Sequence, residues 1–139
     1  MDEVELRPFR LADYEAVIRF WAGVGLKPSR SDTEARFAYK LERDPELFLL
    51  AIREGEIVGT VFASYDGRRG WMNRLAVAPA LRGQGLARRL AAEVERRLRH
   101  IGCDKINLLI EPDNAAVQGL YEKMGYEPVP LIFMEKWLA

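Results

Sequence analysis

Hydrophobic and polar positions repeat along this chain with a period of about 2 residues in some stretches and about 3.6 residues in others. The first period is typical of a strand with one buried face, and the second of an amphipathic helix. The pattern predicts a strand at 4–9, helices at 11–25 and 33–44, three strands within 47–78, a helix at 85–101, a strand at 104–111, a helix at 114–124 and terminal strand material at 126–138. The expected order of elements is therefore β-α-α-β-β-β-α-β-α-β.

Cap and turn signals mark several boundaries of these elements. Ser31 or Asp32 is suited to cap the second helix, and Pro45 closes it off. The segments 53–56 and 65–70 each carry the glycine that hairpin turns demand. The three central strands are therefore expected to form an antiparallel meander.

The helix at 85–101 carries the clearest pattern of the chain. One apolar stripe is formed by Leu86, Leu90, Val94, Leu98 and Ile101. Opposite charges lie four residues apart on the other side, as in the pairs that Glu93 forms with Arg89 and with Arg97. Because a strand precedes and follows this helix, a crossover over 71–111 is expected, with one parallel pair in a mostly antiparallel sheet. The expected fold class is mixed α/β.

Composition bounds the size and the class of the protein. A chain of 139 residues with 49% hydrophobic residues can bury one core and is short for two, so we expect a single domain over 1–139. With 21 basic and 21 acidic residues, the formal net charge is zero, which argues against nucleic acid or a membrane surface as a partner. A single Cys103 and a single His100 argue against disulfides and a metal site. Without an apolar leader or span, we expect a cytoplasmic protein.

The stretch APALRGQGLA at 78–87 places Gly83 and Gly85 where the longest helix begins. The first amides of a helix have no internal acceptor, and the helix dipole adds about half a positive charge at that end. Glycines let a phosphate approach these amides, and Arg82 and Arg88 raise the local potential. The loop is therefore suited to a pyrophosphate, although a tight turn with solvated arginines accounts for the same residues.

Two known phosphate-binding motifs are incomplete in this sequence, which narrows the choice of phosphate ligand. A P-loop requires Gly-Lys-Ser/Thr, which does not occur in this chain. A dinucleotide fingerprint would continue from Gly83 and Gly85 to Gly or Ala at the position of Arg88. Both nucleotide interpretations are weakened, so a nucleotide-binding fold is the least favoured hypothesis for this chain.

Two motifs together make this sequence resemble the GCN5-related N-acetyltransferase (GNAT) superfamily over essentially its full length. The acetyl-CoA signature Q/R-x-x-G-x-G/A is matched by Arg82, Gly85 and Ala87. A second signature, an Asn that starts the next helix and a Tyr seven residues later, is matched by Asn114 and Tyr121. The order of elements agrees as well, and within the superfamily the chain is most similar to small, stand-alone bacterial acetyltransferases.

The resemblance implies a central sheet with helices on both faces and a parallel strand pair that diverges at the cofactor cleft. Acetyl-CoA would be the co-substrate, and no metal would be needed. The resemblance assigns its binding to Leu75, Ala76, Val77, Arg82, Gly83, Gln84, Gly85, Leu86, Ala87, Arg88, Asn114 and Tyr121. Pantetheine would pair with the backbone of 75–77, the pyrophosphate would meet the amides of 83–88, and an amide near Leu75 or Ala76 would polarise the thioester carbonyl. The amine attacks directly, so Cys103 is not expected to act as a nucleophile.

The resemblance also suggests the groups that move protons. Tyr121 would be the general acid for the departing thiolate, although its spacing alone equally fits an apolar helix face. Relatives often carry a glutamate early on the fourth strand or midway along the fifth, where this chain has Trp71, Asn73 and Leu109. The general base is therefore assigned tentatively to Glu111. Asp113, Asp66 and Tyr65 are weaker candidates, and a water chain or an already neutral amine would also serve.

The acceptor is not specified by the sequence. In the family, the acceptor cleft is walled by the first two helices and later strands, which here supply aromatic residues such as Phe20, Trp21, Phe37, Tyr65 and Trp71. A small-molecule amine or a peptide or protein amine is the expected partner, and the protein would be a monomer or homodimer. The rival hypothesis is a non-catalytic acyl-CoA-binding module with the same fold, which the lack of an obvious base favours.

Overall fold

The computed structural model describes residues 3–111, 115 and 117–139 of the chain. Its contacts divide the chain into two compact units, residues 1–109 and residues 110–139, and each unit is described by itself. The expectation of one domain over the whole chain stays a prediction. Within the described residues, no helix combines the length and the apolar character that crossing a membrane requires.

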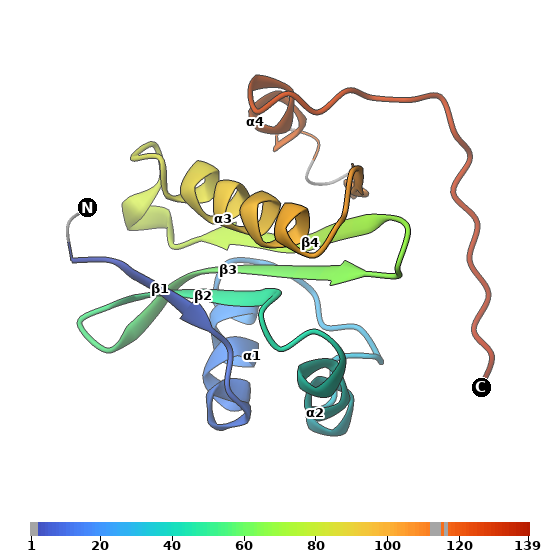
Figure 1. Ribbon diagram of the computed structural model, residues 1–139. Coiled ribbons are helices and arrows are strands. Elements are labelled where there is room, and N and C mark those ends of the chain that lie inside the picture. Colours follow the sequence, from blue (N-terminus) through green and yellow to red (C-terminus); the bar gives the residue numbers. More distant parts are fainter. Residues whose placement is uncertain (1–2, 112–114, 116) are drawn as a thin grey trace. The chain divides into compact units, whose positions relative to one another are not determined.

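The first unit is built on a five-stranded sheet in which spatial order follows chain order (Figure 1). Its strands are β1 (Glu5–Pro8), β2 (Phe48–Arg53), β3 (Glu56–Tyr65), β4 (Gly70–Val77) and β5 (Ile106–Asn107). The first four strands are antiparallel neighbours, whereas β4 and β5 are parallel. The predicted meander and the predicted parallel pair are therefore confirmed.

Helices cover both faces of this sheet, as expected. Helices α1 (Tyr14–Gly23) and α2 (Glu34–Arg43) lie on one face, and α3 (Leu86–His100) lies on the other (Figure 1). A short 3-10 turn, η1 (Leu11–Asp13), leads into α1. The fold is the mixed α/β class that the sequence predicts.

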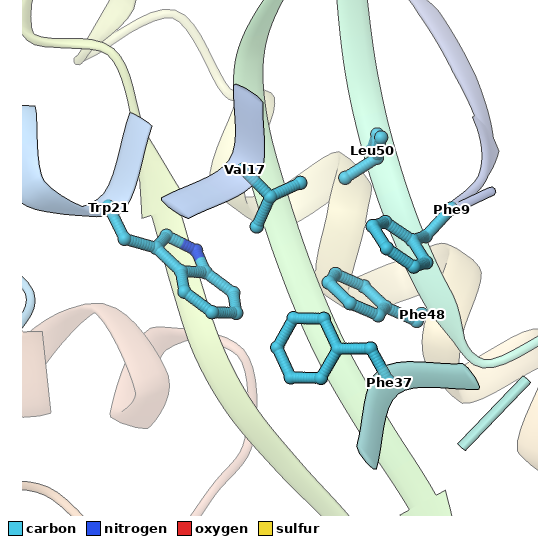
Figure 2. Packing of buried hydrophobic residues seen from close by; sticks show 6 residues of the cluster. All are labelled: Phe9, Val17, Trp21, Phe37, Phe48 and Leu50. Atoms are coloured by element: carbon cyan, nitrogen blue, oxygen red, sulfur yellow. The ribbon is translucent and has the colours of Figure 1, made fainter. Parts of the chain in front are cut away.

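The face beneath α1 and α2 carries an aromatic core (Figure 2). Its buried members are Phe9, Val17, Trp21, Phe37, Phe48 and Leu50. Phe9 stacks on Phe48 with ring centroids 4.4 Å apart, and Phe37 meets both rings edge-on. Such offset and edge-to-face contacts add to the free energy gained by burying the rings.

The face beneath α3 is aliphatic. The helix buries Leu86, Leu90, Ala91, Val94 and Leu98, which include four members of the predicted stripe. Two glycines lie beneath it: a Cβ on Gly59 would meet Leu90 Cδ1 at 3.0 Å, and a Cβ on Gly70 would meet Cys103 Sγ at 2.9 Å. The bare strand backbone at these positions lets α3 approach the sheet closely.

Several boundaries differ from the predictions. Thr33, rather than Ser31 or Asp32, caps α2 by accepting a hydrogen bond from the Arg36 amide. The expected strand at 104–111 shrinks to β5, because only two residues of β4 pair with it.

The described residues of the second unit form one short helix and a following segment without regular secondary structure. Helix α4 (Gln118–Lys123) ends before Gly125, as predicted, and Gly125 takes the left-handed conformation usual after a helix. The prediction of terminal strand material at 126–138 is wrong, because the structure has no strand there. Pro128 and Pro130 cannot donate ladder hydrogen bonds, and the Leu131 amide donates locally to the carbonyl of Val129.

Candidate active site

Strand β4 is interrupted by a β-bulge in its second half. Thr60 of β3 pairs with Ala76, but Phe62 pairs with Asn73, so two residues of β4 lie opposite one residue of β3. Arg74 in this bulge has φ +54°, a left-handed conformation that arginine rarely adopts. The bulge changes the direction of the backbone immediately before residues 75–77.

The edge of β4 that faces β5 is paired only at its beginning. Gly70 pairs with Ile106 and Trp71 with Asn107, and in the described part of the chain the ladder between these strands ends there. Residues 72–77 continue along the same strand past the end of this ladder. Their backbone groups on this edge form a template to which an extended chain of amides can add.

A glycine loop joins β4 to α3. After a short 3-10 turn, η2 (Pro79–Leu81), Gly83 has φ +80° and Gly85 has φ +86° and caps the helix, which begins at Leu86. Apart from the glycine and its two chain neighbours, no atom of the described residues lies within 4 Å of a Cβ built on either glycine. These glycines therefore serve the left-handed backbone and leave the amides at the start of α3 uncovered.

Side chains of the loop hydrogen bond back to it. Arg82 Nε donates to the carbonyl of Val77 at 3.2 Å, and Gln84 Nε2 donates to the carbonyl of Ala80 at 3.5 Å. Arg88 lies exposed on the first turn of α3. Arg82 thus closes the loop onto the end of β4, a contact that the sequence alone does not reveal.

Tyr121 lies on α4 in the second unit and is buried. Its ring meets that of Tyr126 edge-on, with centroids 5.6 Å apart. Burial raises the pKa of Tyr121 to about 12, because the phenolate would lose its hydration. The phenol is therefore protonated throughout the neutral pH range.

The candidate bases differ in their surroundings. Glu111 is exposed and lies beyond the end of β5, rather than within a strand as expected. Asp66 accepts hydrogen bonds from the amides of Arg69 and Arg68 in the turn before β4, and these bonds lower the pKa of its carboxyl group. Asp113, like Asn114 among the cofactor-binding candidates, lies outside the described residues.

The aromatic side chains expected around the acceptor fall into two groups. Trp21 and Phe37 are buried members of the core, so they do not line a surface cleft. Phe20, Tyr65 and Trp71 are half-buried. No cluster of three or more His, Cys, Asp or Glu among the described residues is arranged to hold a metal ion.

Two residues at the bulge escaped the sequence reasoning. The Thr60 hydroxyl is buried and donates to the carbonyl of Arg74 at 2.8 Å. A threonine inside an otherwise apolar strand segment was the available signal. The position of Arg74 carried no comparable signal, because a bulge residue in a left-handed conformation is typically glycine.

Comparison with known sequences gives a match over most of the chain. A family model described as the acetyltransferase (GNAT) family matches residues 12–126. A protein named acetyltransferase from Pectobacterium atrosepticum is 45% identical over 135 residues, which cover 97% of this chain and 96% of that relative.

Solved structures show the same fold at low identity. Ard1 from Thermoplasma volcanium superposes with a TM-score of 0.80 at 22% identity, over 92% of this chain and 85% of that one. The PaiA N-acetyltransferase from Thermoplasma acidophilum, solved in complex with coenzyme A, gives a TM-score of 0.74 at 18% identity over 89% of each chain.

Proposed function

Because this chain belongs to the acetyltransferase (GNAT) family, we propose that it transfers an acetyl group from acetyl-CoA directly to a primary amine. Membership of the family confirms the resemblance found in the sequence. The observation that carries the proposal is the partly unpaired edge of β4, which runs into a glycine loop at the beginning of α3. An extended amide chain followed by a pyrophosphate, as in coenzyme A, matches these two features in this order.

The pyrophosphate would lie at the amides of 83–88. Gly83 and Gly85 leave these amides open, and the dipole of the 15-residue helix α3 favours negative charge at its N-terminus. Arg88 adds positive charge on the first turn. The complex of PaiA with coenzyme A supports the choice of ligand, since that protein shares the fold.

Pantetheine would pair with residues 75–77, beyond the end of the β5 ladder. An amide near Leu75 or Ala76 would then donate to the thioester oxygen and stabilise the negative charge that develops on it. The amine nitrogen forms a bond to the acetyl carbon as the carbon–sulfur bond breaks. The amine loses a proton and the sulfur gains one, so the reaction balances without a covalent enzyme intermediate.

Tyr121 is the proposed donor of a proton to the departing sulfur. A pKa of about 12 keeps the phenol protonated, which a general acid requires. We therefore expect Tyr121→Phe to lower kcat and to leave the affinity for acetyl-CoA nearly unchanged. A loss of affinity instead would make the tyrosine structural.

Glu111 is the proposed group that removes the proton of the amine, directly or through water. Its exposed carboxyl group is accessible to a substrate. Glu111→Gln should lower turnover more at neutral pH than at alkaline pH, where the amine is already neutral and needs no base. An unchanged profile would remove Glu111 from the mechanism and leave a water chain or a neutral amine.

Calorimetry with acetyl-CoA tests the proposal as a whole. Acetyl-CoA should bind, CoA should compete, and ATP should do neither; failure of acetyl-CoA to bind at high micromolar concentration would overturn the proposal. Gly83→Val should weaken binding at least about tenfold by covering the amides. Gly55→Val is the matched control, because Gly55 has φ +79°, no described neighbour within 4 Å of its Cβ and a place in the β2–β3 turn.

Thiol release over a library of amines then separates an enzyme from a binding module. The library should include peptide N-termini, lysine side chains, polyamines and amino sugars. Solved structures that share this fold include AAC(6')-Iy with a bisubstrate analog, CoA-S-monomethyl-acetylneamine, and the NatC complex with a Gag peptide and CoA. Release of CoA with one class identifies the acceptor. Binding of acetyl-CoA without release for any class would favour the non-catalytic module.

A further inference from the structure

Arg74 has a backbone conformation that must be held by its surroundings. Its φ of +54° lies in the left-handed region, where a residue with a long side chain is strained. Such conformations persist only where neighbouring groups fix them. In this structure both ends of the residue, the carbonyl and the guanidinium, have defined partners.

The carbonyl is held from inside the aromatic core. Thr60 Oγ1 donates to the carbonyl oxygen of Arg74 at 2.8 Å and accepts from Trp21 Nε1 at 2.9 Å. Thr60 is fully buried, so both hydrogen bonds are shielded from water. This chain of bonds joins α1 to the bulge through one hydroxyl group.

The guanidinium is held by the loop between α1 and α2, residues 24–33. Arg74 Nη2 donates to Asp32 Oδ2 at 2.8 Å and to the carbonyl of Lys27 at 3.0 Å, and the guanidinium lies 4.9 Å from the centre of the Trp21 ring. The hydroxyl of Tyr14 donates to the carbonyl of Asp32 at 2.6 Å. The loop is thus fastened at the same residue that forms the bulge.

We propose that Arg74 is a positioning residue that couples loop 24–33 to the backbone direction of β4 at Leu75. This inference rests on the proposed function, in which an amide at Leu75 or Ala76 polarises the thioester. Thr60 and Asp32 act through Arg74, since each holds one of its ends. Loosening either end lets the bulge relax and moves the polarising amide, while the glycine loop and its pyrophosphate site stay intact.

The chain provides a matched control in a second arginine–aspartate pair. Arg7 and Asp13 also lie 2.8 Å apart, and the Asp13 carboxylate, like that of Asp32, accepts from the amide three residues before it. The side chains are similarly exposed, at 17% for Asp13 and 13% for Asp32. Asp13 differs in that its arginine lies on β1 and not in the bulge.

The test compares Asp32→Asn with Asp13→Asn in steady-state kinetics. Asp32→Asn should lower kcat about tenfold, because a small misplacement of a catalytic donor has a large effect, while KM for acetyl-CoA changes less than about threefold. Asp13→Asn should leave kcat within about twofold. Equal losses of kcat in both variants would overturn the proposal, since they would indicate a general effect of destabilisation.

Substitutions at Thr60 and at Arg74 itself test the contributions of the carbonyl and of the guanidinium of Arg74 individually. Thr60→Val should lower kcat about as much as Asp32→Asn, and Thr60→Ser, which keeps the hydroxyl, should restore it. Arg74→Gly removes the guanidinium without backbone strain, because glycine accepts the left-handed conformation. Wild-type kcat in Arg74→Gly or Thr60→Val would contradict a positioning role.

Amide hydrogen exchange distinguishes failure of this inference from failure of the proposed function. Asp32→Asn, a change in loop 24–33, should speed exchange in residues 72–77, and Asp13→Asn should not. This readout needs no substrate, so it stands even if the wild-type protein releases no thiol with any amine. Unchanged exchange in residues 72–77 would show that the loop and the bulge are independent.

Discussion

The two faces of the central sheet are packed by different means. Beneath α3 the core is aliphatic, and the bare backbone of Gly59 and Gly70 lets the helix approach closely. Beneath α1 and α2 the core is aromatic, and a line of hydrogen bonds runs through it from Trp21 to Thr60 and the bulge. The core beneath α3 holds this helix by the shape of its apolar side chains, whereas the core beneath α1 and α2 fixes the backbone of β4 by directed polar contacts.

This difference matches what each face supports. The start of α3 must be placed accurately against the sheet because its first amides form the proposed pyrophosphate site. The bulge must hold one amide in a fixed direction, which non-directional packing does not achieve. The loss of stability caused by altering either face, or the solvent side of α3, therefore measures what holds that part in place.

The largest expected loss of stability follows Leu90→Ala. Leu90 is fully buried under α3, so truncation should lower the free energy of unfolding by about 3 kcal/mol through lost burial and a residual cavity. Urea denaturation measures the loss. Leu90→Met keeps most of the volume and should cost much less; equal losses for both would show that shape is not what fixes this face.

Thr60→Val should have the next largest effect on stability. The substitution keeps the shape but leaves the Trp21 indole N–H and the Arg74 carbonyl without their partner, so we expect a loss of about 2 kcal/mol. Urea denaturation again provides the measurement. A loss near zero would mean that the polar contacts of the aromatic face contribute no stability, so that this face too would be held by packing alone.

Gly59→Ala should cost about 1 kcal/mol, because the added Cβ would lie 3.0 Å from Leu90 Cδ1. The informative measurement is the double variant with Leu90→Ala, where the vacated space accommodates the methyl group. The double variant should then lose less stability than the sum of the losses in the two single variants. Strict additivity would indicate that Gly59 is limited by its other neighbours, Ala51 and the Ala76 carbonyl.

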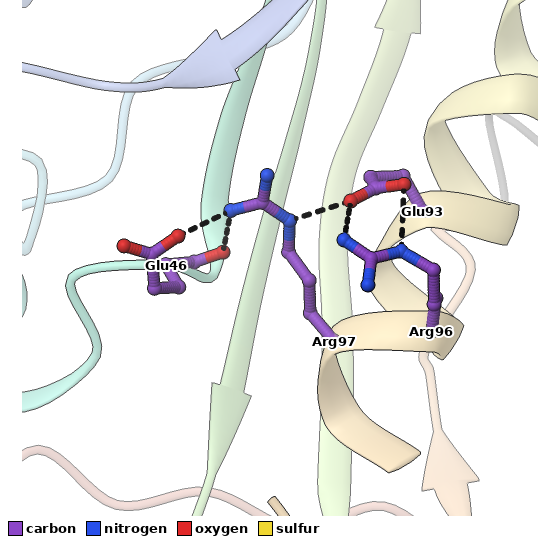
Figure 3. A network of polar contacts seen from close by, with 4 residues as sticks. All are labelled: Glu46, Glu93, Arg96 and Arg97. Carbon is purple, nitrogen blue, oxygen red and sulfur yellow. Dashed lines mark hydrogen bonds and ion pairs between the residues drawn. The ribbon is translucent and has the colours of Figure 1, made fainter. Parts of the chain in front are cut away.

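The smallest effect is expected on the solvent side of α3 (Figure 3). Glu93 accepts from Arg96 and Arg97, which lowers the pKa of its carboxyl group to about 2, and Arg97 also reaches Glu46 before β2. Since the folded pKa lies below the unfolded value, this stabilisation is present above about pH 4.5 and is lost as pH falls through about 2.

Glu93→Gln should therefore cost about 0.5 kcal/mol at pH 7, as ion pairs at a protein surface typically do, and almost nothing near pH 2. Denaturation at both values measures the difference. A loss that persists unchanged at pH 2 would show that packing, rather than charge, explains the effect. A loss larger than that of Thr60→Val would show that the ion pairs on the solvent side of α3 contribute more to the free energy of unfolding than the buried polar contacts do.

The sequence predicted those parts of the fold that depend on local periodicity. The meander and α3 are marked by alternation, turn glycines and an apolar stripe within single windows of the chain. The pair between Glu93 and Arg97 was predicted for the same reason. Arg89 instead donates to the Val4 carbonyl, a contact 85 residues away that no local pattern contains.

The details that the sequence missed depend on distant contacts. Asp32 was a reasonable helix cap, but its carboxylate serves Arg74, 42 residues along the chain, and Thr33 caps the helix instead. The proposed cofactor loop was visible because glycines and arginines cluster within a few residues. The bulge was not, since its position depends on the register between β3 and β4 and on a hydroxyl from another strand.

Trp21 gives the bulge an intrinsic optical reporter. Its indole is buried, hydrogen bonded to Thr60 and covered by the Arg74 guanidinium, so its emission depends on both ends of that arginine. Trp71 is half-buried and Trp137 is exposed, and replacing both with phenylalanine leaves Trp21 as the single tryptophan. Opening of loop 24–33 would then change the wavelength and intensity of the Trp21 emission, which stopped-flow fluorescence follows on the millisecond scale without an added label.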